Sequence, residues 1–167
     1  MIRHRYGLIG FFFKLLPLLV GAVVAGGFSV AMADQSYPYD GVVSIKVEKP
    51  YKELSADLKD AIKLNKMGLV TRATASGGAA AQGITIPGNM VVGVYRNDFA
   101  RRMLAASIPA GIEAPIRFYL TENKDGTTNL TYRKPSAVFA PYNSEELDVM
   151  AKELDAIFDA IAQGATK

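Results

Sequence analysis

The sequence of 167 residues has no cysteine, no tryptophan and a single histidine, His4. The absence of cysteine excludes disulfides, iron–sulfur clusters and a lipid-modified cysteine as an anchor. Because His4 lies in a stretch typical of a removable leader, the remaining chain has neither His nor Cys. Ser-His-Asp and Cys-His catalysis are therefore excluded as they are usually built, and zinc sites lose their usual ligands. Stability must come from a packed core, which a chain of this length can form as one domain.

Residues 1–33 have the three parts of a secretory signal peptide: a basic start, an apolar middle and a small-x-small end. The residues that mark the start and the cleavage region are Arg3, His4, Arg5, Ala31, Ala33 and Asp34. This pattern predicts cleavage after Ala33 and export of residues 34–167 to the periplasm or the exterior of the cell.

A membrane tether is the alternative interpretation of the same segment. The uncharged run from Leu15 to Ala33 is 19 residues long, close to the roughly 20 residues that span a bilayer. Pro17 and three glycines weaken this run as a permanent helix. We therefore favour cleavage, and an inner-membrane anchor over residues 15–33 is the competing hypothesis.

Removal of the leader changes the net charge of the chain. The full sequence carries 19 Lys and Arg against 16 Asp and Glu, a formal charge of +3. Three of the basic residues and no acidic residue lie in the leader, so residues 34–167 hold 16 of each sign. A neutral domain gives no case for nucleic-acid binding.

Hydrophobic periodicity predicts strands and helices in alternation. Apolar residues at every second position predict strands over 43–47, 69–75 and 89–95, and a hairpin over 116–132 with its turn at 123–126. Apolar residues at three- and four-residue spacing predict helices over 50–67, 97–107 and 143–164. Because hairpins dominate, we expect a two-layer α+β fold: a mainly antiparallel sheet of about four to five strands, with helices packed on one face.

Helix ends and breaks are expected at polar residues and glycines. Asn97 or Asp98 is expected to cap the middle helix, and Asn143, with Glu146 three residues later, to cap the last one. Ser76-Gly77-Gly78 is expected to break the second strand as a turn, an interpretation we favour over an anion-binding backbone nest. No repeat or linker divides residues 34–167, so we expect a single domain.

Six short motifs follow one another along the chain in a characteristic order. They are Lys66-Met67-Gly68-Leu69-Val70, Arg96-Asn97-Asp98-Phe99, Met103-Leu104, Ala106-Ser107-Ile108-Pro109, Ala114-Pro115-Ile116-Arg117 and Thr131-Tyr132-Arg133-Lys134-Pro135. With these motifs, over about residues 43–162, the chain resembles the domain of unknown function 302 family. The resemblance implies a fold similar to that of the TATA-box-binding protein without DNA binding, and no established activity. The family's strand-to-helix junction commonly reads Gly-Asn-Pro, and only Asn97 matches it here.

The strand phases place basic and aromatic side chains on the sheet face away from the helices. These are Lys46, Arg72, Tyr95, Arg117, Tyr119 and Arg133. The last helix is acidic instead, through Glu145, Glu146, Asp148, Glu153, Asp155 and Asp159. Arginine and tyrosine together suit an anionic small molecule, a lipid headgroup or a polysaccharide, through charge-assisted hydrogen bonds and stacking. A solvated face with cross-strand pairs, or a face that pairs with a second copy in a homodimer, is the alternative.

A second chemical hypothesis uses Asp98 and Glu113 as acid and base, because they flank the middle helix. The plainer interpretation is a helix cap and a solvated loop residue. The sequence as a whole therefore predicts an exported, non-catalytic binding or envelope-associated protein without metal or cofactor. The alternatives are a carboxylate-dependent enzyme and a self-associating structural protein.

Overall fold

The computed structural model describes residues 37–167. The predicted cleavage site at Ala31, Ala33 and Asp34 and the alternative anchor over residues 15–33 lie outside the described residues. Within residues 37–167, no helix is both long enough and apolar enough to cross a bilayer.

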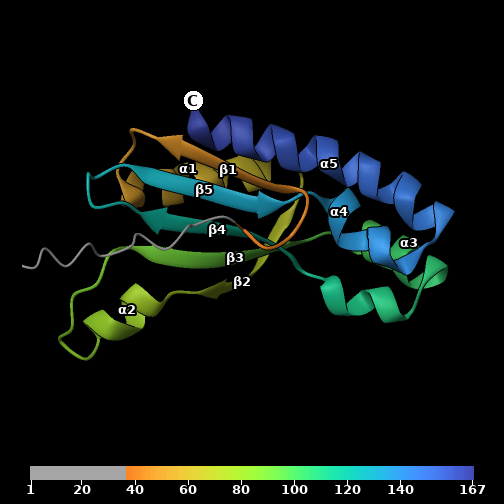
Figure 1. Cartoon of the computed structure of the whole chain (residues 1–167), viewed down its shortest axis with the longest axis horizontal. Helices are drawn as coiled ribbons and strands as arrows, with labels where there is room; N and C mark the ends of the chain where they lie inside the picture. The colour runs from red at the N-terminus through yellow and green to blue at the C-terminus, as the bar shows by residue number, and fades with distance from the viewer. Residues whose placement is uncertain (1–36) are drawn as a thin grey trace, which may run out of the picture. The chain divides into compact units, whose positions relative to one another are not determined.

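Strands and helices alternate along the described chain (Figure 1). In order they are β1 (Val42–Val47), α1 (Tyr51–Leu64), β2 (Gly68–Ala73), α2 (Ala75–Ala80), β3 (Asn89–Tyr95), α3 (Asn97–Ala106), η1 (Pro109–Glu113), β4 (Ile116–Glu122), β5 (Thr128–Arg133), α4 (Pro135–Phe139), η2 (Ala140–Tyr142) and α5 (Glu145–Thr166), where η marks a 3₁₀-helix.

The strands form one five-stranded sheet in the order β1-β5-β4-β3-β2, and every neighbouring pair is antiparallel. The predicted α+β class and the hairpin of β4 and β5 are confirmed. Gly126 closes the hairpin turn with φ of +83°, a conformation that glycine adopts without steric cost.

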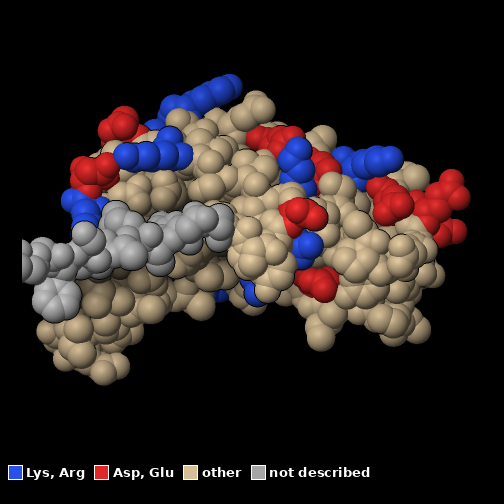
Figure 2. All heavy atoms as spheres, in the orientation of Figure 1, with Lys and Arg blue, Asp and Glu red and all other residues tan. Residues whose placement is uncertain are grey.

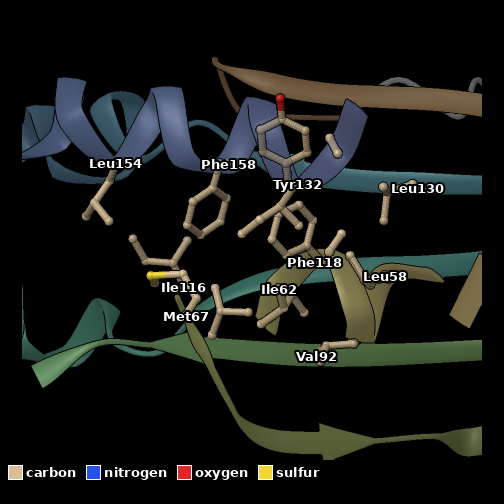
Figure 3. Packing of buried hydrophobic residues seen from close by; sticks show 14 of the residues in the cluster. Leu58, Ile62, Met67, Val92, Ile116, Phe118, Leu130, Tyr132, Leu154 and Phe158 are labelled. Atoms are coloured by element: carbon tan, nitrogen blue, oxygen red, sulfur yellow. The ribbon is translucent and has the colours of Figure 1, made fainter. Parts of the chain in front are cut away.

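The core lies between the sheet and the helices on one of its faces (Figure 3). Helices α1 and α5 pack against each other, and both contribute fully buried side chains. On the sheet side, alternate residues of β3, β4 and β5 point into this core, among them Val92, Phe118 and Leu130. The opposite face, which we call the open face, carries the intervening residues.

Two predicted helix caps differ in the structure. Asn97 and Asp98 do not cap α3: the extended Arg96 takes the cap position, and its guanidinium binds Asp98. Asn143 has a left-handed backbone, and the hydroxyl of Ser144 caps α5 by accepting from the N–H of Leu147. Both errors arise because several polar residues precede each helix, and the sequence alone does not show which of them takes the N-cap position.

The Ser76-Gly77-Gly78 segment lies inside the short helix α2 and is not a strand-breaking turn. Its first backbone N–H groups already have acceptors within the chain: Asn89 Oδ1 accepts from Ala75 and Ser76, and Thr74 Oγ1 accepts from Gly77. The hypothesis of an anion nest is therefore wrong, because these donors are already used.

Gly93 of β3 is required by the packing of the open face. A Cβ there would lie 2.2 Å from Thr71 Oγ1 and 2.7 Å from Pro115 Cγ. We therefore expect Gly93→Ala to lower the free energy of unfolding by about 1–2 kcal/mol through overpacking. Gly78→Ala is the control, because its Cβ would meet nothing within 4 Å. Urea denaturation followed by circular dichroism measures both, and equal stabilities would contradict the expected overlap.

Candidate ligand-binding site

The antiparallel register brings two arginines together on the open face. Gly93 pairs with Arg117 across β3 and β4, and Val42 pairs with Arg133 across β1 and β5. Because Phe118 pairs with Tyr132, the next step of the same ladder sets Arg117 beside Arg133. Two cationic side chains from neighbouring strands thus lie in one row across the sheet.

The next row of the open face is polar and aromatic. Tyr119 pairs with Thr131, which in turn pairs with Ser44. The hydroxyl of Thr131 lies 2.9 Å from that of Ser44 and 3.1 Å from that of Tyr37. Tyr37 belongs to the segment that enters β1, so this hydroxyl network ties the entry segment to the centre of the face.

Arg133 is fixed in place by that same segment and by α4. Its Nε donates to the carbonyl of Asp40 at 3.2 Å, and a terminal nitrogen donates to the carbonyl of Ala137 at 2.9 Å. The guanidinium carbon lies 5.3 Å from the ring centroid of Tyr39, a cation–π contact. Arg133 is therefore a positioned cation whose charge is not neutralised by either of these carbonyl acceptors.

These side chains line one open hollow of about 410 Å³. Its polar and aromatic lining residues are Tyr37, Tyr39, Glu113, Arg117, Tyr119, Thr131, Tyr132 and Arg133. A hollow with apolar walls and a few converging polar groups is the usual form of a small-molecule site. We call it the Arg117–Arg133 hollow.

Arg117 is the exposed cation of this hollow. Within residues 37–167, it takes part in none of the four ion pairs, which join other residues. Tyr119 beside it is 38% exposed. A guanidinium with accessible donors next to an accessible phenol ring can bind an anion and pack on an attached ring at once.

Glu113 is the one carboxylate of the described residues that lines the hollow. Its Oε1 accepts a hydrogen bond from the hydroxyl of Tyr142 at 2.9 Å. This hydrogen bond raises the pKa of Tyr142 above its ordinary value. Glu113 therefore places one carboxylate in the lining of an otherwise basic hollow.

The comparisons with known proteins agree with this fold. The sequence model of the family called domain of unknown function DUF302 matches residues 43–163. The chain belongs to the DUF302 family. No curated protein matches the chain.

A solved structure of the same family has a similar fold. The crystal structure of the uncharacterized conserved protein DUF302 from Bacillus stearothermophilus aligns with a TM-score of 0.67 at 16% sequence identity. The alignment covers 77% of this chain and 99% of that one. At this identity the likeness shows the fold of the DUF302 domain, and the similarity to the TATA-box-binding protein stays a prediction.

Three of the six open-face residues predicted for this DUF302 domain meet in the hollow: Arg117, Tyr119 and Arg133. Lys46 is on the open face, but its ammonium binds Asp125 at 2.7 Å in the hairpin turn. The hydrogen bond from Lys46 holds the pKa of Asp125 well below its usual range. Tyr95 lines a different cavity, within the core.

Arg72 lies on the other side of the sheet from the hollow. It pairs with Val92, a core residue, and its Nε lies 2.9 Å from the sulfur of Met90. A register shift between Leu69 and Thr71 is the reason. One extra residue in a strand reverses the alternation of every residue after it, so the prediction for Arg72 is wrong.

The core cavity near Tyr95 is lined mainly by apolar residues, including Met67, Phe99 and Met103. Its volume is about 30 Å³, far below the roughly 300–1,000 Å³ of typical ligand pockets. It therefore offers no room for an organic ligand in this conformation.

The proposed acid–base pair is divided between two places. Asp98 binds Arg96 through both carboxylate oxygens, at 2.8 and 3.1 Å. The hydrogen bond from Arg96 is the main cause that lowers the pKa of Asp98. Glu113 lines the Arg117–Arg133 hollow and Asp98 does not, so the hollow holds one of the two carboxylates.

Tyr37, Tyr39 and Thr131 line the hollow, although the strand phases predicted no role in the site for any of them. A weak signal for the tyrosines was available, because Tyr37 and Tyr39 flank a proline immediately before the first strand. For Thr131 the signal was its place in the alternation of the hairpin. It pairs with Tyr119, a residue already placed on the open face.

Proposed function

We propose that this DUF302 domain is an exported, non-catalytic protein that binds an anionic ligand in the Arg117–Arg133 hollow. The ligand carries a carboxylate, phosphate or sulfate group on a flat or sugar-like body. The observation that carries the proposal is the exposed guanidinium of Arg117 in a tyrosine-lined hollow. The leader pattern supports export, and the lack of His and Cys after residue 33 favours binding over catalysis.

The two arginines of the hollow have different roles in binding. Arg133 is held by backbone carbonyls and by Tyr39, so it supplies a fixed positive field. Arg117 supplies the donors that contact the anion, because charge-assisted hydrogen bonds to a guanidinium are strong and directional. The ring of Tyr119 supports the body of the ligand.

Arg117→Glu tests the proposal with the smallest disturbance of the fold. We expect it to weaken anion binding by about 10- to 100-fold, the effect of losing a hydrogen bond to a charged group. The matched control is Arg101→Glu on α3, an exposed arginine outside the hollow. The three probes are heparin oligosaccharides, vesicles of phosphatidylglycerol and inorganic phosphate, each titrated at low and high salt.

The three arms distinguish the sources of the anion. Salt-sensitive binding of heparin alone indicates a polysaccharide, binding of phosphatidylglycerol vesicles but not phosphatidylcholine vesicles indicates a lipid headgroup, and saturable binding of inorganic phosphate indicates a small anion. Equal binding by Arg117→Glu and Arg101→Glu would refute the role of the hollow. Absence of binding in all three arms would refute the ligand class.

A further inference from the structure

Glu113 stays apart from the two arginines of the Arg117–Arg133 hollow, although all three side chains line it. It is the last residue of η1 and lies four positions before Arg117 of β4. Within residues 37–167, none of the four ion pairs includes Glu113. The hollow therefore presents one negative group and two positive groups that do not neutralise one another by direct contact.

Tyr142 holds the carboxylate of Glu113 in this position. Its hydroxyl donates to Glu113 Oε1 at 2.9 Å, and its ring lies 6.5 Å from that of Phe139 between centroids. Tyr142 itself is not among the residues that line the hollow. Because the two oxygens of a carboxylate accept about four hydrogen bonds in all, Glu113 keeps the capacity to accept from a ligand. Its side chain is partly exposed, so a ligand in the hollow can reach it.

The charges of the lining indicate what kind of ligand balances them. Two guanidinium groups against the one carboxylate of Glu113 leave a charge of +1 among the lining residues. A ligand with a single negative charge neutralises this lining. A zwitterion does not, because its own ammonium cancels its negative group. The donor that Glu113 accepts from is therefore best supplied by a neutral hydroxyl group.

The rest of the hollow suits a ring with apolar faces and a polar edge. Val42 and Val138 form part of its apolar lining, and the exposed ring of Tyr119 adds an aromatic surface. A sugar ring has C–H groups on its faces and hydroxyl groups around its edge, and its C–H faces pack on aromatic rings. The volume of about 410 Å³ lies in the lower part of the roughly 300–1,000 Å³ that ligand pockets span.

We infer that the hollow selects an acidic sugar, a ring with one carboxylate and free hydroxyl groups, and that Glu113 is the residue that selects for the hydroxyls. The inference rests on the proposed function, because Arg117 has to bind the carboxylate of the sugar. Glu113 accepts from a hydroxyl of the ring, and Tyr142 is a positioning residue for Glu113. An anion without hydroxyl groups meets the repulsion of Glu113 and gains no hydrogen bond in return.

Glu113→Gln tests the inference with two probes of equal charge, galacturonate and cyclohexanecarboxylate. The second probe keeps the six-membered ring and the carboxylate but has no hydroxyl groups. We expect the variant to bind galacturonate about tenfold more weakly, because it loses a charge-assisted hydrogen bond. It should bind cyclohexanecarboxylate about two- to threefold more tightly, because one negative charge has left the hollow. Titrations of the full-length chain, followed by NMR chemical shifts, measure the dissociation constants.

The matched control is Glu145→Gln on α5, an exposed glutamate outside the hollow, which is expected to bind both probes as the wild type does. If Glu113→Gln changes the affinity for both probes in the same direction, Glu113 acts by its charge alone and the inference is overturned. A wild type that prefers cyclohexanecarboxylate would also overturn it. So would tighter binding of the aminomethyl derivative of cyclohexanecarboxylate than of galacturonate, because the selected donor would then be an ammonium.

Arg117→Glu distinguishes failure of the inference from failure of the proposed function. If it leaves the affinity for both probes unchanged, the proposed function fails. If it weakens both probes and Glu113→Gln does not separate them, only the selection by Glu113 fails. Galacturonate oligomers identify the source of the sugar: tighter binding than the monomer indicates a polysaccharide, and equal or weaker binding indicates a free sugar acid. Both results support an acidic sugar.

Tyr142→Phe tests the positioning role. The variant keeps the ring beside Phe139 but removes the hydroxyl that donates to Glu113. We expect it to lower the preference for galacturonate over cyclohexanecarboxylate by about threefold, a smaller effect than that of Glu113→Gln. In the double variant, Tyr142→Phe should add nothing to the loss from Glu113→Gln, because both act through one carboxylate. Equal losses in the presence and absence of Glu113 would contradict this role.

Discussion

Replacement of Phe118 by alanine is expected to lower the free energy of unfolding by about 3–5 kcal/mol. Phe118 of β4 is fully buried, and its ring stacks on Phe158 of α5 with centroids 4.8 Å apart. It also contacts Tyr132 of β5, at 5.2 Å between centroids. This aromatic cluster joins the central strands to the longest helix (Figure 3), so the cavity left by alanine has rigid walls on both sides.

Guanidinium chloride denaturation, followed by far-ultraviolet circular dichroism, measures the loss. Tyr119→Ala is the neighbouring control, because its side chain lies on the open face and is 38% exposed. It is expected to cost less than about 1 kcal/mol, as surface substitutions usually do. If the two variants lose equal stability, the core does not lie on the Phe118 side of the sheet.

The sequence was most informative where periodicity is long and unbroken. In β4, Ile116, Phe118 and Leu120 alternate with Arg117 and Tyr119, and the structure buries the first three. A half-buried strand in a two-layer fold must alternate in this way. The long apolar stripe of α5 is equally regular, and Ile161 at its far end is fully buried.

Periodicity failed where a single residue shifts the phase. The shift in β2 moved Arg72 to the helix-covered face. A composition of small and β-branched residues, as in this strand, does not reveal a bulge, because the bulge depends on how the chain meets β3. The predicted ends of α3 and α5 were also displaced by one or two residues, because neighbouring polar residues compete for the cap.

The candidate site was only partly predictable because it depends on contacts between distant residues. Arg117 and Tyr119 could be placed on one face from a single strand. The contacts of Tyr37 with Thr131 and of Arg133 with Asp40 each span more than ninety positions in the sequence. Such contacts follow from the strand order, which places β1 beside β5.

The acidic residues of α5, which the sequence grouped together, have different roles in the structure. Glu153 binds Arg102, Asp155 accepts from the N–H of Ser136, and acidic side chains gather where α5 begins (Figure 2).

Tyr132→Phe is expected to lower the free energy of unfolding by about 1.5–3 kcal/mol at neutral pH, the usual contribution of a hydrogen bond to a charged group. The hydroxyl of Tyr132 donates to Asp159 Oδ1 of α5 at 2.5 Å, and the side chain is buried. The substitution removes this donor and leaves the carboxylate without it. Chemical denaturation at pH 7 measures the loss.

The same side chain makes stability depend on pH at the alkaline end. Burial, and then the hydrogen bond to Asp159, raises the pKa of Tyr132 above its ordinary value. Below pH about 10, tyrosine is protonated in both the folded and the unfolded chain, so the contribution of Tyr132 is fully present. As the pH rises through that value, the unfolded chain loses its proton while the folded chain keeps it, and stability falls.

Tyr132→Phe should therefore remove part of the loss of stability above pH about 10. The difference between wild type and variant should shrink as the pH rises, because the wild type loses the contribution that the variant never had. Asp159→Asn is the companion variant: it keeps an acceptor for the hydroxyl but removes the charge, so its loss at pH 7 should be smaller. A constant difference between wild type and Tyr132→Phe from pH 7 to pH 11 would show that the proton on Tyr132 is held no more tightly in the folded chain than in the unfolded one.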